Sequence, residues 1–173
     1  MIFNILLELL FLAIPLYYFR KHKLKPVKEL GLERKKASQA WKYTLIILAA
    51  MFIAAMALSA LLSLVNYNDL GKVSEALQEG KQDQAYFVFA LTAGVVLEEF
   101  FFRGFLVKRI GVLWSSALFG AMHLLYASIA EIAGAFVLGL VLALCWKKYK
   151  NLYANTYAHL LWNAIGLIAN TLV

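Results

Sequence analysis

Long runs of apolar residues dominate the chain, and short polar connections separate them. The runs lack the strict apolar–polar alternation of half-buried strands, and most are near the ~20 residues that a helix needs to cross a membrane. The pattern predicts helices at residues 2–19, 43–65, 85–106, 112–128, 132–146 and 152–172. We therefore expect an all-α, polytopic transmembrane helical bundle of about six spans.

Composition agrees with a membrane protein. Hydrophobic residues make up 63% of the chain and charged residues 16%, whereas soluble domains are roughly half apolar and one quarter charged. The single cysteine, Cys145, lies within an apolar run and can form neither an internal disulfide nor a thiolate metal site. Disulfide scaffolds and zinc fingers are therefore excluded.

The net charge of +7 follows the connections between the apolar runs. Lysine and arginine gather in the first, third and fifth connections. In the second connection acidic residues balance the lysines, and the only charged residue of the fourth is Glu131. This alternation is what the positive-inside rule produces. It predicts cytoplasmic basic connections, both termini outside, a lipid bilayer as partner and no nucleic-acid partner.

A few ionisable side chains interrupt the apolar runs at membrane depth. Such groups cost roughly 2.5 kcal/mol or more each at mid-bilayer, so they face the protein interior or a water-filled cavity. At 1.5 Å per residue, Glu98, His123 and His159 each lie roughly 12–16 Å from the end of their run that adjoins a basic connection. This common depth predicts a shared site in the cytoplasmic half of the bilayer.

Local spacing divides the tasks among these residues. Glu99 and Arg103 are four positions apart in the order that favours an intrahelical ion pair. Glu98 points about 100° away from Glu99 on a helix and is free for reaction. Phe119 lies four positions before His123, which predicts an aromatic wall beside that imidazole.

These residue types suit the hydrolysis of an amide bond. A carboxylate in apolar surroundings is a competent general base near neutral pH, and a histidine can share its water. A second histidine and a side-chain amide, such as His159 and Asn163 on one helix face, can donate to an oxyanion. Glu98, His123 and His159 would also be a catalytic zinc set assembled across helices.

A function from another class uses the same residues. A proton-coupled or ion-coupled transporter would employ Glu98, His123 and His159 as a relay within the membrane. Inverted repeats and paired helices broken by glycine or proline are typical of such transporters, and the sequence contains neither. The pattern therefore favours hydrolysis over transport.

Three short motifs resemble those of a known family. Glu98-Glu99-Phe-Phe-Phe-Arg103 resembles EExxxR, Phe119-Gly-Ala-Met-His123 resembles FxxxH, and His159-Leu-Leu-Trp-Asn163 resembles HxxxN of the CPBP intramembrane proteases. That family includes the eukaryotic CAAX prenyl endopeptidase and the bacterial Abi and bacteriocin-immunity proteins. We therefore divide the chain into N-terminal spans with a basic cytoplasmic connection, 1–84, and a protease core of four helices, 85–173.

The resemblance implies a role for each motif residue. Glu98 with His123 would activate the attacking water, and His159 with Asn163 would form the oxyanion hole. Glu99, Arg103 and Phe119 would support the site. The family has been described both as metalloproteases and as metal-independent glutamate proteases, which leaves zinc open.

The resemblance also predicts the setting in which the protein acts. The expected substrate is a membrane-associated peptide or protein, and a role in bacteriocin immunity or peptide maturation is the alternative within the family. The CAAX endopeptidase has more spans than the six expected here, so a prenylated substrate is not assumed. A short chain with polybasic connections and no organelle signal predicts the plasma membrane of a prokaryote.

Overall fold

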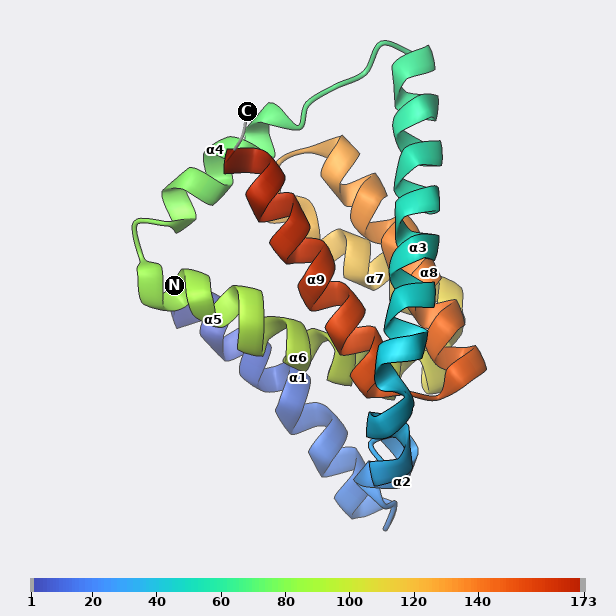
Figure 1. The fold of residues 1–173 in the computed structure, drawn as a ribbon. Helices are drawn as coiled ribbons and strands as arrows, with labels where there is room; N and C mark the ends of the chain where they lie inside the picture. Colours follow the sequence, from blue (N-terminus) through green and yellow to red (C-terminus); the bar gives the residue numbers. More distant parts are fainter. Residues whose placement is uncertain (1, 172–173) are drawn as a thin grey trace.

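The computed structural model describes residues 2–171, and the side-chain surroundings of residues 8–169. All regular secondary structure in this range is helical (Figure 1), which confirms the all-α class. In chain order the elements are α1 (Ile2–Lys21), α2 (Pro26–Leu30), α3 (Arg34–Leu64), α4 (Gly71–Gly80), α5 (Gln84–Phe89), η1 (Ala90–Gly94), α6 (Val95–Glu98), η2 (Glu99–Leu106), α7 (Val107–Ala121), η3 (Met122–Tyr126), α8 (Ile129–Tyr149) and α9 (Leu152–Thr171).

Each predicted apolar run lies mainly on helix. Within the described residues, three helical stretches are long and apolar enough to cross a membrane: Pro26–Leu64, Gln84–Tyr126 and Ile129–Tyr149. The fold is therefore that of an integral membrane protein. The finer count of six spans stays a prediction.

The stretch Gln84–Tyr126 reverses its direction at Gly111. This residue has φ +85° and ψ 172°, a backbone conformation that essentially only glycine adopts. On the far side of the turn, Ser115 Oγ donates a hydrogen bond of 2.7 Å to the carbonyl oxygen of Phe102. The predicted runs 85–106 and 112–128 are therefore two separate arms that fold back on each other.

The N-terminal helices share a hydrophobic core with the C-terminal ones. Ala40, Ile47 and Met51 of α3 are buried in one cluster with residues of α8 and α9, such as Leu142 and Ala158. Packing therefore continues across the division predicted between residues 84 and 85. That division stays a prediction.

The connections meet at two opposite ends of the bundle. At one end, which we call the basic end, the connections 22–33, 107–111 and 150–151 come together. There Lys108 Nζ lies 2.9 Å from Glu29 Oε2, and the Asn151 amide donates a 2.8 Å hydrogen bond to the carbonyl oxygen of Lys36. At the other end, residues 66–70 lie against the turn before α8; we call them the strap. Figure 1 shows α2 at the foot of the bundle and α4 near its top.

Candidate active site

Glu99 joins two of the three motifs inside the bundle. Its side chain is fully buried, and Oε1 lies 3.0 Å from Arg103 Nη1, so the predicted ion pair is present. The same oxygen accepts a 2.9 Å hydrogen bond from His159 Nδ1, and Oε2 accepts a 3.4 Å hydrogen bond from the Asn155 amide. These partners occupy the Glu99 carboxylate, which leaves the neighbouring Glu98 as the carboxylate free for chemistry.

The contact with Glu99 sets the orientation of His159. The hydrogen-bond network assigns a proton to Nδ1, because a carboxylate that also pairs with an arginine accepts rather than donates. Nε2 then points toward Glu98, whose Oε2 lies 4.0 Å away. That separation is too long for a direct hydrogen bond but suits a water that bonds to both atoms.

Phe119 lies at the centre of the motif residues. Its buried ring carries the Arg103 guanidinium carbon 4.0 Å from the ring centroid, in a cation–π contact. The His123 and His159 rings stand edge-on, with centroids 5.0 and 5.7 Å from that of Phe119. The predicted aromatic wall beside His123 is therefore shared by both histidines.

The backbone fixes the ring of His123. Its Nδ1 lies 3.0 Å from the carbonyl oxygen of Phe119, one turn earlier, so Nδ1 donates and Nε2 is left with a free lone pair. Within residues 8–169, no hydrogen bond or ion pair joins His123 to Glu98, and the observed neighbour of Glu98 is His159. Their cooperation on one water stays a prediction.

Asn163 lies with both histidines on the wall of a cavity of about 390 Å³. Glu98 does not line this cavity, but its Oε2 atom lies 4.0 Å from Nε2 of His159, which does. The side chain of Glu98 is 27% exposed. The oxyanion donors expected from the sequence, His159 and Asn163, therefore share one cavity.

Two features of the site were missed by sequence reasoning. The first is η2, which carries Glu99 and Arg103 and is a π-helix, a rare winding that is frequent at functional sites. Hydrophobic periodicity gives no signal for it. The second is Asn155, which bonds to Glu99 and lies four positions before His159, as Asn163 lies four after it. This polar stripe on an apolar helix was a signal that could have identified Asn155.

A further carboxyl group lies near the site on α1. Glu8 contacts Gly94, where an added Cβ atom would meet its Oε2 atom at 3.2 Å. Oε2 of Glu8 is buried without a hydrogen-bond partner among the described residues, and Glu8 interacts electrostatically with Glu98. Sequence reasoning gave Glu8 no role.

Glu98, His123 and His159 are the zinc ligands expected from the sequence. In residues 8–169, no group of three or more histidine, cysteine, aspartate or glutamate side chains is placed to hold a metal ion, Glu98, His123 and His159 included. Contacts to Glu99 and to the Phe119 carbonyl occupy Nδ1 of His159 and of His123. These contacts leave Nε2 of both histidines available, as in a histidine that ligates a metal ion, so the zinc site expected from the sequence stays a prediction.

Comparison with known proteins bears on the whole site. Residues 81–165 match the family described as Type II CAAX prenyl endopeptidase Rce1-like. No curated protein and no solved structure matches the chain. The matched region contains all three motifs, so the family resemblance drawn from them is confirmed.

Proposed function

We propose that this chain, whose residues 81–165 match the family described as Type II CAAX prenyl endopeptidase Rce1-like, is an intramembrane endopeptidase. Its substrate is a membrane-associated peptide or protein, cleaved by a water molecule that Glu98 and a histidine activate. The buried 2.9 Å hydrogen bond between Glu99 and His159 carries the proposal. It joins two motifs that lie far apart in the sequence and leaves Nε2 of His159 directed at Glu98.

Each motif residue has one step in the reaction. Glu98 accepts a proton from the water, held also by the free Nε2 of His123, as the water oxygen attacks the carbonyl carbon. The carbonyl electron pair moves onto its oxygen, to which the Asn163 amide and Nε2 of doubly protonated His159 donate. Glu98 then returns the proton to the amide nitrogen, the C–N bond breaks, and a carboxyl group and an amine leave.

Glu99 and Arg103 act as positioning residues in this scheme. Both are almost completely buried, and Glu99 holds the His159 ring so that Nε2 is the atom available to the reaction. A carboxylate that orients a catalytic histidine through a hydrogen bond to its other ring nitrogen is common in hydrolytic sites. Phe119 contacts both imidazoles and supports Arg103 on its face.

The arrangement of the connections supports the six-span topology. The first, third and fifth connections carry the lysines and arginines and meet at the basic end. We propose that this end is cytoplasmic in a prokaryotic plasma membrane, with both termini outside. Reporter fusions at the two termini and at residue 110 test this: fusions at both termini should report the outside, and the fusion at residue 110 the cytoplasm.

The function is tested in liposomes with a library of quenched fluorescent peptides that carry apolar segments. Wild-type protein should cleave a subset of them. Alanine at Glu98, His123 or His159 should each lower kcat/KM by about 10²-fold or more, and alanine at Asn163 by a smaller factor. Each variant must keep the wild-type elution profile and unfolding temperature for its result to count.

Two results would contradict the proposal. One is wild-type protein that cleaves no peptide yet dissipates a pH gradient across the liposome membrane, which would favour the transport relay. The other is full activity in Glu98→Ala. Stoichiometric zinc in the purified protein, with activity lost to a chelator and restored by zinc, would overturn the proposed metal-free mechanism while leaving the endopeptidase function intact.

A further inference from the structure

The cavity that contains the two histidines extends well beyond them. It has a volume of about 390 Å³ and lies between α3, α8 and α9. Its wall is chiefly apolar and includes Met51 and Leu58 of α3, Leu138 of α8 and Trp162 of α9. Ligand pockets commonly have such a mostly apolar wall with a few polar groups at defined places.

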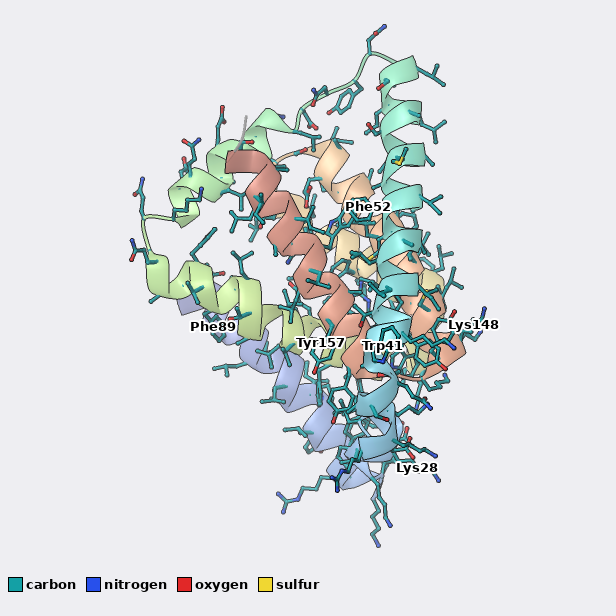
Figure 2. All side chains as sticks on the ribbon, viewed as in Figure 1. Lys28, Trp41, Phe52, Phe89, Lys148 and Tyr157 are labelled. Carbon is teal, nitrogen blue, oxygen red and sulfur yellow. The ribbon has the colours of Figure 1, made fainter. Side chains whose placement is uncertain are left out.

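The polar groups of the cavity lie at its two ends. His159 and Asn163 are on its wall where α9 passes α3, and Phe52 of α3 contacts Trp162 of α9 at that level, with ring centroids 5.1 Å apart. Ser63, at the far end of α3, and Tyr67 of the strap mark the other end. Figure 2 shows Phe52 on α3 well away from Lys28 at the basic end.

The cavity is long enough to lead from the strap to the reaction site. Met51 and Ser63 both line it and are twelve positions apart on α3, which corresponds to roughly 18 Å along a helix. An extended peptide rises about 3.3 Å per residue, so about five residues fit this length. The cavity is therefore long enough to bind one side of a cleaved segment.

A single carboxylate fastens the strap across this end. Asp69 accepts hydrogen bonds from Ser128 Oγ at 2.7 Å and from the backbone N–H groups of Ile129 and Ala130 at 2.8 and 3.1 Å. These donors form the first turn of α8, where a negative charge is favoured by the helix dipole. Asn68 and Leu70, on either side of Asp69, line the cavity.

We infer that this cavity binds an apolar peptide segment of the substrate that enters from the strap end, opposite the basic connections, and that the Asp69-fastened strap closes over it. The inference rests on the proposed endopeptidase function and names its substrate class and route. An apolar segment suits the wall because Glu131 is the only aspartate, glutamate, lysine or arginine among the described lining residues. An extended backbone suits the end of the cavity where His159 and Asn163 lie, because both would donate to one of its carbonyl groups.

A glycine on α8 allows the groove to be filled with little strain. Gly134 lines the cavity, and a Cβ atom added there meets no atom within 4 Å. Gly134→Leu should therefore keep or raise the unfolding temperature, since leucine favours helix over glycine. Gly166 on α9 is the matched control, because it is equally unobstructed but does not line the cavity.

The expected result separates the two variants. Gly134→Leu should raise KM at least tenfold or abolish cleavage, and Gly166→Leu should leave KM within twofold of wild type. Equal KM values in a folded Gly134→Leu variant would overturn the inference while leaving the endopeptidase function in place. Should Gly134→Leu fail to fold, Ala55→Phe on the facing wall serves the same test, with the exposed, non-lining Ile53→Phe as its control.

The entry route has a test that needs no cleavage. In a Cys145→Ala background, Ser59→Cys in the cavity wall and Lys28→Cys at the basic end are exposed to a membrane-impermeant charged maleimide in oriented vesicles. Ser59→Cys should react from the side opposite Lys28→Cys, and adding Asp69→Asn should speed this reaction severalfold. Reaction of both cysteines from the same side, or a rate unchanged by Asp69→Asn, would overturn the route even if the protein proves to be a protease.

Discussion

The two ends of the bundle are built in opposite ways. At the basic end, Leu30, Trp146 and Asn151 are at most 1% exposed, and side chains hydrogen-bond across the connections. At the strap end, a cavity lies between the helices and one carboxylate fastens the connection over it. The basic end is therefore closely packed, and the strap end contains the cavity through which we propose that the substrate enters.

In our proposal this difference places the rigid packing and the substrate entry on opposite sides of His159 and Glu98. His159 lies seven positions after the start of α9, close to the packed end, and Glu99 and Arg103 are buried beside it. A side chain that must present one particular atom to the reaction needs rigid surroundings that keep its orientation. The other face of His159 opens on the cavity, from which we propose that the substrate arrives.

Removing Glu99 should damage the packed side most. Glu99→Ala leaves the Arg103 guanidinium, 1% exposed, without its ion pair inside the bundle. Loss of one partner of a buried pair costs about 3–5 kcal/mol, so the protein should unfold at a much lower temperature or fail to accumulate. Glu98→Ala is the control, because Glu98 is partly exposed and its removal should leave the unfolding temperature nearly unchanged.

Two glycines compare the ends directly. Gly31 at the basic end has φ +72°, and an added Cβ atom would collide with the carbonyl oxygen of Lys150. Gly31→Ala should therefore lower the free energy of unfolding by roughly 2–4 kcal/mol. Gly71, just after the strap, has open space around it, so Gly71→Ala should stabilise by about 0.5 kcal/mol. Equal effects of the two changes on denaturant unfolding would erase the proposed contrast.

A smaller loss is expected from the cap of α9. The Asn151 side chain donates to the carbonyl oxygen of Lys36 and accepts from the backbone N–H of Ala154 at 3.1 Å. Asn151→Ala leaves both groups without this partner inside a fully buried site, at a cost of about 1–3 kcal/mol. Thermal unfolding measures the loss, and Asn151→Asp should recover part of it, because the carboxylate keeps the contact to Ala154.

Much of this architecture follows from the sequence, for physical reasons that also show where prediction stops. Apolar runs set the helices, because hydrocarbon leaves the backbone no other partner. The pair of Glu99 with Arg103 followed from spacing along one helix. The hydrogen bond from His159 to Glu99 depends on how two helices are rotated against each other, which no single-helix spacing determines.

The strap was beyond sequence reasoning for a similar reason. Asp69 lies in a short polar connection, where the sequence predicts an ordinary solvated charge. In the structure its partners include the backbone N–H groups of Ile129 and Ala130, about sixty positions later. Backbone donors carry no residue signature. The π-winding of η2 is likewise invisible, since its residues also suit an α-helix.

The strap should respond to pH only under strong acid. Burial would raise the pKa of Asp69, but hydrogen bonds from Ser128, Ile129, Ala130 and Tyr67 outweigh it and hold that pKa well below its usual value. A depressed pKa in the folded state adds stability above the unfolded value, ~3.9, and that stability is lost as pH falls through the folded value. Hydrogen exchange of the Ile129 and Ala130 backbone N–H groups, which donate to Asp69, should therefore stay slow from pH 7 to pH 5.

Asp69→Asn sharpens the same point at constant pH. The amide keeps the shape of the side chain but removes the charge at the first turn of α8, so exchange of the Ile129 and Ala130 backbone N–H groups should be faster than in wild type already at pH 7. Exchange at the basic end, around Asn151, should not change. Fast exchange of the Ile129 and Ala130 backbone N–H groups in wild type at pH 7 would show that Asp69 does not hold the strap.

The central claim is that Glu98 is the base of a peptide hydrolase, and one substitution tests it most directly. Glu98→Gln keeps size and polarity but cannot take a proton from water, whereas Glu75→Gln makes the same change on the exposed face of α4. In proteoliposomes, with products identified by mass spectrometry, Glu98→Gln should lower kcat by about 10²–10⁴-fold with an unchanged unfolding temperature. Glu75→Gln should cleave as wild type does. A folded Glu98→Gln variant that cleaves at the wild-type rate would contradict the account.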